Sequence, residues 1–408
     1  AHFARYLFPL ITIPYVVRKL GVTRWGDVAF IQVYGAYLFI VVEFGFNLSA
    51  TREVSRSRNV PGELERIFGS VLGAKSLLAL LAVGLTALLQ PHILRFRENP
   101  MLLWIAVSAS ILEGFGLQWF FQGLERIRLL AVLNLLNPLV ATVAIFLFVK
   151  APQDGWKLFA CYAFAQSFSL TISFLLSFRH LRWRFPEKAF IVEHLRKSFS
   201  FFVVRISSML YFSGNTFILG MWGTPLQIAH FAAAEKLASN LRMILRPAIE
   251  TLFPRMSYSV VHERRAAVSL SLRILVAFVG IGVLCTIAID LLAPLVVGIL
   301  FGAEFRPAVP ILRILGLFPL VIGVNHFLGS LWMVPLGLER AFSRVLMVMG
   351  VVNCVASIAV VKGWPTDAPV AIAWVIIGVQ VAIGITFFAI LRIRRLDPFS
   401  LAQRGIEA

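Results

Sequence analysis

The sequence predicts an all-α protein that crosses a membrane many times. Hydrophobic residues make up 59% of the 408 residues and charged residues 14%, whereas soluble domains average about 45–50% and about 25%. The apolar residues recur in blocks close to the roughly 20 residues that a helix needs to cross a bilayer. The short alternating segments of a membrane β-barrel are absent. We therefore expect a polytopic helical bundle.

Twelve spans are predicted in chain order, and short connections leave no room for a soluble catalytic domain. The segment "LLAPLVVGILFG" (Leu291–Gly302) is too short to cross easily, so we expect a kinked or interfacial helix there. The predicted spans are 3–17, 27–49, 68–89, 101–121, 129–149, 156–178, 199–220, 227–253, 268–289, 308–331, 342–361 and 369–391.

Lysine and arginine are concentrated in alternate connections. The most polar connection is "RHLRWRFPEKAFIVEHLRK" (Arg179–Lys197), at the middle of the chain. The positive-inside rule places this connection and both termini in the cytoplasm. The net charge of +18 is explained by such loops, so no nucleic-acid partner is expected.

Two sequence matches indicate an internal repeat. GLER occurs at Gly123–Arg126 and at Gly337–Arg340, and LG enters a span both in "KLGVTRWGDVAF" and in "ILGMWGTPLQIAHF". We predict two six-helix lobes, residues 1–178 and 199–408, joined by a cytoplasmic linker, 179–198. Parallel repeats of this kind commonly hold a transporter's substrate between them.

The stretch "AAAEKLASNLRMILRPAIETLFPRMS" (Ala232–Ser257) carries unusual charge for a spanning segment. On a helix, Glu235, Arg242, Arg246 and Glu250 share one face, with Lys236 beside them. A charge facing lipid costs at least about 2.5–3.5 kcal/mol, so this face must meet protein or water. Either the acids and arginines pair as structural contacts, or the face lines an anion-binding cavity.

A cation surplus favours the cavity. Arg205 and Arg313 also lie in spans of the second half, and forked guanidinium groups suit the oxygens of a diphosphate. Arg5, Lys75 and Arg273 could instead extend to the membrane interface.

Glu43 and Glu113 are acids within first-half spans. A buried carboxylate without a nearby cation can carry a proton, which makes both candidates for ion coupling, together with Glu235 and Glu250. The alternatives are a hydrogen-bonded neutral acid or pairing with a base.

No enzyme motif is present. The chain has no HExxH, GxSxG, P-loop or dinucleotide-binding turn, so we expect no enzyme, no cofactor, no metal and no ATP-driven transport. Three cysteines, at 161, 285 and 354, are expected to pack as small apolar residues. The chain begins at Ala1 without Met, so we expect its natural start to be missing.

The ordered segments resemble the polysaccharide transporter family, the Wzx-type flippases of the multidrug/oligosaccharidyl-lipid/polysaccharide (MOP) exporter superfamily. The resembling stretches are "IPYVVRKLGVTRWGDVAF", "EFGFNLSATREVSRSR", "QWFFQGLER", "AAAEKLASNLRMILRPAIETLFPRMS" and "LFGAEFRPAVPILRIL".

The resemblance implies two six-helix lobes in a V around a central cationic cavity, in a bacterial inner membrane. It implies transfer of undecaprenyl-diphosphate-linked sugar repeat units to the periplasmic leaflet, with a polysaccharide polymerase and chain-length machinery as partners. Arg52, Arg205, Lys236, Arg242 and Arg246 would be its cavity cations. Gln118, Trp119, Asn215 and Asn325 are candidates for sugar contact.

Three other functions stay open at this point. A drug exporter of the same superfamily fits the cation surplus poorly, a membrane glycosyltransferase or ligase lacks its large loop or paired acids, and a scaffold leaves the intramembrane charges unexplained. The glycan carried, the coupling ion and the oligomeric state are not defined by the sequence.

Overall fold

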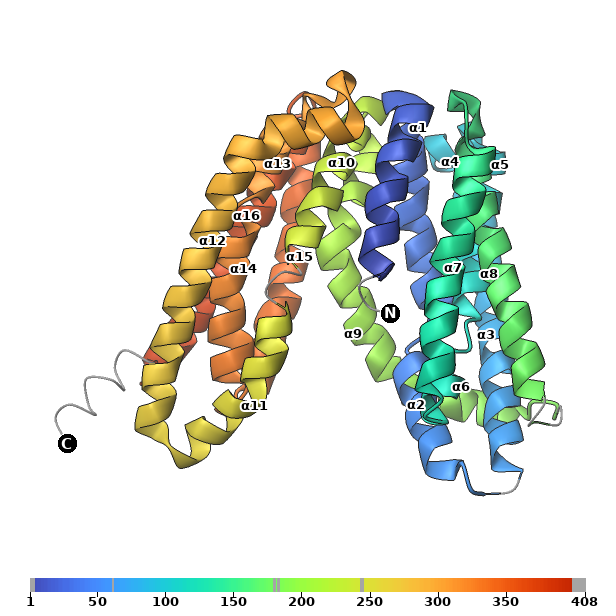
Figure 1. Cartoon of the computed structure of the whole chain (residues 1–408), viewed down its shortest axis with the longest axis horizontal. Helices are drawn as coiled ribbons and strands as arrows, with labels where there is room; N and C mark the ends of the chain where they lie inside the picture. Colours follow the sequence, from blue (N-terminus) through green and yellow to red (C-terminus); the bar gives the residue numbers. More distant parts are fainter. Residues whose placement is uncertain (1–3, 61, 179–180, 182–183, 243–245, 398–408) are drawn as a thin grey trace. The chain divides into compact units, whose positions relative to one another are not determined.

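The computed structural model describes residues 4–60, 62–178, 181, 184–242 and 246–397, and every regular element in these ranges is a helix (Figure 1). Side chains are described in the same ranges except at 4–7, 10, 208, 210–213, 241–242, 246–247, 261 and 264–265. The predicted all-helical, multi-pass fold class is confirmed.

The chain forms two compact units, residues 1–217 and 218–408. The helices that begin in unit 1 are α1 (Ala4–Glu43), α2 (Phe46–Ser57), α3 (Glu63–Leu89), α4 (Leu94–Glu98), α5 (Pro100–Gly114), α6 (Gln118–Gly123), α7 (Ile127–Phe148), η1 (Pro152–Asp154), α8 (Gly155–Phe178) and α9 (Lys188–Trp222). Within this unit α5 and α7 both pack against α8.

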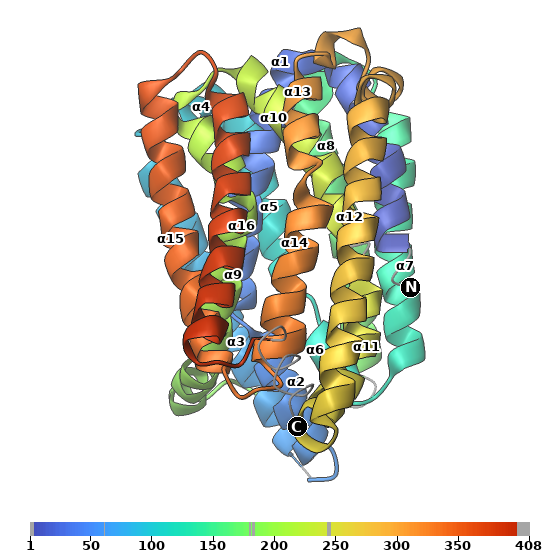
Figure 2. The same cartoon turned by 90° about the vertical axis from the view of Figure 1, so that its left-hand side faces the viewer.

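The helices of unit 2 follow those of unit 1 along the chain. They are α10 (Pro225–Arg242), α11 (Arg246–His262), α12 (Arg264–Phe301), η2 (Ala303–Phe305), α13 (Ala308–Leu315), α14 (Phe318–His326), η3 (Phe327–Met333), α15 (Glu339–Gly363) and α16 (Ala368–Ile393). Figure 2 shows α15 beside α16, and α14 packs against both α12 and α16.

Nine helical runs in the described residues are long and apolar enough to cross a membrane. The first run, Ile11–Ser57, includes parts of the first two predicted spans, whose helices meet directly at Gly21 with φ 74°. The predicted spans 199–220 and 227–253 fall on α9, α10 and α11.

Two local expectations are wrong. Residues 291–301 form no separate short helix, because α12 continues through Pro294 to Phe301. The polar mid-chain segment is not all connection either, since α9 already begins at Lys188.

Basic side chains at the polar start of α9 form contacts with nearby acidic side chains. Lys197 Nζ lies 2.7 Å from carboxylate oxygens of both Glu193 and Glu53, and hydrogen bonds to these acids raise the pKa of Lys197. His194 is buried beside Glu53, with Nε2 to Oε2 at 3.1 Å. Burial lowers the pKa of His194 although Glu53 opposes the shift. These contacts join α9 to α2.

Most of α9 packs with unit 1 rather than with the helices that follow it. Phe217 stacks on Phe30 with ring centroids 5.3 Å apart, and a Cβ on Gly45 would lie 2.6 Å from Phe201 Cβ. The division therefore falls after Phe217, whereas the sequence placed the start of the second lobe at residue 199.

The GLER segments occupy similar places in the two units. Gly123 ends α6 just before α7, and Gly337 precedes α15. Both turns use left-handed backbone, at Glu125 (φ 59°) and at Gly337 (φ 75°). When the sequence is aligned with itself so that Gly123 matches Gly337, the residues of α8 align with those of α16.

The aromatic residues of "QWFFQGLER" belong to a hydrophobic core of unit 1. Trp119, Phe120 and Phe121 are almost fully buried, and Phe68 packs against Phe120 with centroids 5.1 Å apart. This core anchors the short helix α6, which positions Gln118 for the site described next.

Candidate functional site

A break between α1 and α2 places one carboxylate inside unit 1. Phe44 and Gly45 both adopt positive φ, 48° and 83°, so the chain changes direction directly after Glu43. The backbone N–H groups of Gly45 and Asn47 donate to the Glu43 carboxylate over 3.2 and 2.7 Å. The acid thereby satisfies backbone donors at the start of α2, as a helix cap does.

Glu43 also has a cationic partner. The Arg205 guanidinium donates to Glu43 Oε2 over 2.7 Å, with the acid 2% exposed and the arginine 40% exposed. The same guanidinium lies 5.2 Å from the centre of the Phe39 ring, within cation–π range. Of the alternatives that the sequence left open for Glu43, the structure shows pairing with a base.

A second cation lies deep in the unit. Lys75 of α3 is fully buried, and its Nζ donates to the Gly116 carbonyl oxygen over 3.1 Å. The ammonium also lies 6.0 Å from the Trp119 ring centre. Lys75 therefore does not extend to the membrane interface, which was one of the two expectations for it.

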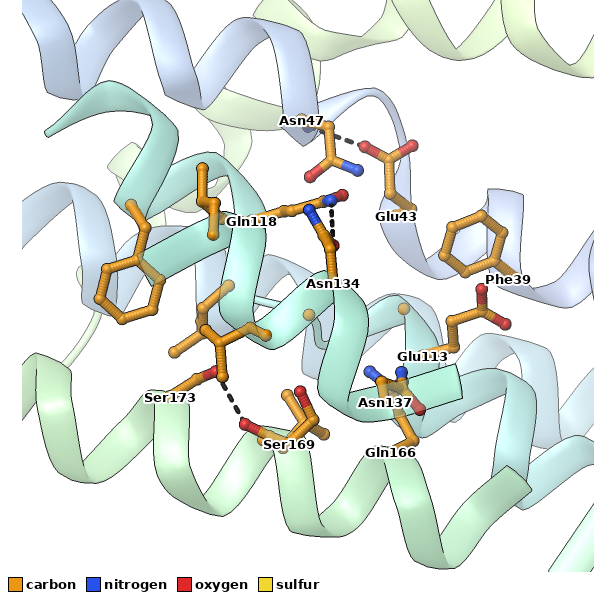
Figure 3. Close-up of a pocket in the computed structure, with 17 residues that line it drawn as sticks. Phe39, Glu43, Asn47, Glu113, Gln118, Asn134, Asn137, Gln166, Ser169 and Ser173 are labelled. Carbon is orange, nitrogen blue, oxygen red and sulfur yellow. Dashed lines mark hydrogen bonds between the residues drawn. The ribbon is translucent and has the colours of Figure 1, made fainter. Parts of the chain in front are cut away.

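Next to Glu43 lies a cavity of about 130 Å³ whose walls come only from unit 1. Helices α1, α5, α7 and α8 supply most of the walls, α2 adds Asn47, and the link through α6 supplies the rest (Figure 3). The polar side chains lining it are Glu43, Asn47, Glu113, Gln118, Asn134, Asn137, Gln166, Ser169 and Ser173.

Side-chain amides dominate these walls. Gln118 Nε2 donates to Asn134 Oδ1 over 2.9 Å, and Asn137 Nδ2 donates to Gln166 Oε1. Ser173 Oγ donates to the Ser169 carbonyl over 2.8 Å, so the hydroxyl group of this serine forms its hydrogen bond within α8. Figure 3 shows Asn137 and Gln166 side by side at the cavity.

Sequence reasoning found Glu43, Glu113 and Gln118 but missed the other polar wall residues. The signal was present as spacing. Asn134 and Asn137 are three residues apart on α7, and Gln166, Ser169 and Ser173 follow at steps of three and four on α8. Such spacing places each set on one helix face.

The structure also describes the surroundings of two other predicted cations of the site. Arg52 is exposed on α2. Arg313 Nε lies 3.2 Å from Asp290 Oδ1, with both side chains about half exposed. Arg313 is thus paired with an acid of α12 within unit 2.

The charges of the Ala232–Ser257 stretch are partly described. Lys236 and Glu235 are half-buried on α10, where the charge of Glu235 acts on Lys236, and Glu250 is exposed on α11. The side chains of Arg242 and Arg246 lie outside the described residues, so their role stays a prediction.

The predicted sugar contacts are placed differently from one another. Gln118 faces the cavity, whereas Trp119 is fully buried in the core and Asn215 is 1% exposed. Asn325 of unit 2 is buried, and its Nδ2 donates to Gln380 Oε1 over 2.8 Å.

The cavity offers hydrogen bonding rather than metal coordination. Among the residues that the structure describes, no three His, Cys, Asp or Glu side chains gather as a metal site. The Glu43 oxygens already accept three N–H donors. The amides carry both donors and acceptors, which suits a polar, uncharged ligand.

Comparison with known structures identifies the fold. The chain is similar to "Lipid II flippase MurJ, inward closed conformation", with a TM-score of 0.73 at 12% identity over 99% of this chain and 89% of that one. It is also similar to an inward-facing multidrug resistance MATE family transporter of the MOP superfamily, with a TM-score of 0.69 at 13% identity over 98% and 99%. At these identities the likeness establishes the fold, which is that of multi-pass membrane transporters.

Sequence comparison identifies the family. Residues 1–260 match the model described as "Polysaccharide biosynthesis protein", and the chain belongs to that family. It is 27% identical to a "Putative O-antigen transporter" of Shigella dysenteriae over 86% of this chain and 88% of that protein. A protein of the same name from Escherichia coli (strain K12) is 26% identical over 86% and 85%.

Proposed function

We propose that the protein is a secondary transporter that moves polyprenyl-diphosphate-linked oligosaccharide repeat units from the cytoplasmic to the periplasmic leaflet. The observation that carries this proposal is the similarity to relatives named as O-antigen transporters over 86% of the chain. The location that goes with it is a bacterial inner membrane with both termini in the cytoplasm. A polysaccharide polymerase and chain-length machinery would act on the delivered units.

The structure supports the physical side of this task. A sugar diphosphate cannot cross hydrocarbon alone, since its polar groups would lose water without replacement. Unit 1 contains a polar cavity among helices long and apolar enough to span a membrane. Such a lining supplies the hydrogen bonds that the sugar would otherwise lose.

The diphosphate is assigned to the cations that the sequence identified: Arg52, Arg205, Lys236, Arg242, Arg246 and Arg313. Two of these already have acidic partners, Glu43 for Arg205 and Asp290 for Arg313. In our proposal a phosphate group competes with those acids for the guanidinium groups. Glu43, Glu113, Glu235 and Glu250 are the acids that would then change charge during ion coupling.

Leaflet exchange in reconstituted vesicles tests the proposal. Purified protein is placed in liposomes with a fluorescently labelled polyprenyl-diphosphate oligosaccharide, and exchange is measured by the label that becomes accessible to an external quencher. The wild type should exchange the lipid, and Arg242→Ala/Arg246→Ala should lower the rate at least about tenfold. A tenfold loss corresponds to about 1.4 kcal/mol, close to the lower end of the roughly 1.5–3 kcal/mol that one hydrogen bond to a charged group contributes.

The matched control removes two arginines elsewhere. Arg394 and Arg395 are exposed after α16, so Arg394→Ala/Arg395→Ala should exchange lipid at the wild-type rate. Unchanged exchange in the folded Arg242/Arg246 variant would remove the site assignment. Absence of exchange by the wild type, with drug sensitivity rather than glycan loss in cells lacking the protein, would replace the function with drug export.

A further inference from the structure

We propose that the polar cavity of unit 1 is a subsite for one uncharged sugar residue of the transported glycan. This inference rests on the proposed function for its ligand class, and on the cavity itself for its place. It assigns one sugar residue to the cavity and leaves the diphosphate to the cations assigned above.

The first argument is size and access. A volume of about 130 Å³ is well below the roughly 300–1,000 Å³ of typical pockets for small molecules, so the cavity has room for no more than one sugar residue of a chain. Asn47, Asn134, Asn137 and Gln166 are only half-buried. A ligand can therefore reach their amide groups without unfolding a helix.

The second argument is the match of hydrogen-bonding groups. A sugar hydroxyl both donates and accepts, and a side-chain amide offers two donors beside one carbonyl acceptor. Five amides face the cavity, at Asn47, Gln118, Asn134, Asn137 and Gln166. Gln118, Asn137 and Gln166 each use one of their amide groups in the pairs described above, and a side-chain amide has more donors and acceptors than one such bond uses.

Apolar side chains complete the lining. Phe39 stands on the α1 side and Phe121 on the α6 side, while Leu130 and Leu133 contribute from α7. Binding sites for small molecules combine such apolar walls with a few placed polar groups. The C–H faces of a sugar ring suit the apolar walls as its hydroxyls suit the amides.

The third argument is charge. Two acids line the cavity, Glu43 and Glu113, and two cations stand close to it. Arg205 pairs with Glu43, and Lys75 donates to the Gly116 carbonyl of the lining. As long as Arg205 stays paired with Glu43, the formal charges are in balance and the cavity itself favours a neutral ligand.

The cavity also offers few uncommitted carboxylate oxygens to coordinate a metal cation. Hard cations need about six or more oxygen ligands with carboxylates among them. Both carboxylate oxygens of Glu43 are committed, Oε1 to Asn47 N–H and Oε2 to Gly45 N–H and Arg205. A cation would have to displace these donors, whereas a sugar would not.

The experiment measures binding of simple sugars to the full-length protein in lipid nanodiscs. The probes are the methyl glycosides of glucose, galactose, rhamnose and N-acetylglucosamine, followed by saturation-transfer difference NMR. We expect at least one glycoside to give a transfer signal with the wild type. Gln166→Leu should lower that signal at least about fivefold, since it removes an amide from the wall.

The repeat supplies a matched control. Gln380 occupies the position in α16 that Gln166 occupies in α8, and its Oε1 accepts a hydrogen bond from Asn325. Gln380→Leu removes the same group from unit 2 and should leave the glycoside signal unchanged. If Gln166→Leu does not fold, Ser173→Leu fills the cavity from the same helix and should also abolish the signal.

Three results would overturn the subsite. Absence of signal from all four glycosides with the wild type is one, and equal signals from wild type and both cavity variants is another. The third is a thermal stabilisation by sodium chloride, but not by choline chloride, that is lost in Gln166→Leu, because it would make the cavity a cation site. Leaflet exchange without glycoside binding rejects the subsite alone, and glycoside binding without exchange rejects the proposed transport alone.

Discussion

The two units use a similar order of helices to build different interiors. At the offset that aligns Gly123 with Gly337, the α8 residues Gln166, Ser169 and Ser173 line a cavity. Their counterparts in α16 are Gln380, Ile383 and Phe387, all almost fully buried. A shared helix arrangement therefore does not determine whether an interior is a polar site or a packed core, because side-chain size and polarity at a few positions decide it.

One ion pair from each unit shows a similar difference in burial. The Glu43–Arg205 pair has an acid that is 2% exposed, whereas the Arg313–Asp290 pair of unit 2 has side chains 45% and 59% exposed. Burial makes a lost partner costly because the remaining charge cannot recover water. The contrast indicates that the Glu43–Arg205 pair matters more for stability than the Arg313–Asp290 pair does.

The largest expected effect tests the two interiors at one repeat position. Phe387 is 1% exposed and stacks on Phe342 with centroids 5.4 Å apart. Phe387→Ala should lower the free energy of unfolding by about 3–5 kcal/mol through lost contacts and a new cavity.

Ser173→Ala at the matching position of unit 1 should cost less than about 1 kcal/mol, because the hydroxyl bonds only within its own helix. Thermal unfolding in detergent measures both changes. Equal losses would show that the unit 1 interior is packed like that of unit 2.

The next effect compares the ion pairs. Arg205→Ala should lower the free energy of unfolding by about 2–4 kcal/mol, because it leaves the Glu43 carboxylate buried without its cation. Arg313→Ala should cost about 0–1 kcal/mol, as for exposed pairs. Restoration of stability in Glu43→Gln/Arg205→Ala would confirm that the uncompensated charge causes the loss, and a loss as large in Arg313→Ala would contradict the comparison.

The smallest effect concerns pH. Burial lowers the pKa of His194, so the folded protein favours the neutral ring. As pH falls below the ordinary histidine value of about 6.5, the unfolded chain binds more protons and stability decreases. His194→Gln should reduce the drop in melting temperature between about pH 7.5 and pH 5, within the range where histidine changes charge.

The control for this change is His262→Gln in unit 2, where the histidine is exposed at the end of α11. That substitution removes no buried ring and should keep the drop of the wild type. A drop in His194→Gln as large as that of the wild type would show that Glu53 cancels the effect of burial.

The sequence allowed much of this fold to be predicted from local properties. Long apolar blocks define helices whatever their neighbours, and the GLER repeat located equivalent turns before α7 and α15. The wrong details were local as well. Residues 291–301 belong to α12, which contains Pro294. Residues 188–197 belong to α9, where Lys197 pairs with Glu193 of the same helix and with Glu53 of α2.

The site was less predictable because it depends on partners distant in sequence. Glu43 was recognised as an unusual acid, but its pairing with Arg205 joins residues on α1 and α9 that no spacing rule connects. Lys75 could equally have reached the interface until the Gly116 carbonyl was placed next to it. The amides of α7 and α8 each form a visible stripe, yet only packing of the two helices makes them one wall.

Composition and periodicity by themselves determined that this protein is a helical, multi-pass membrane protein with excess positive charge. Those properties follow from the cost of placing polar groups in lipid, which acts on each segment separately. The tertiary structure alone decided which charges are neutralised and where a polar cavity remains. Electrostatic pairing and cavity volume depend on distances between helices, and a linear sequence does not contain those distances.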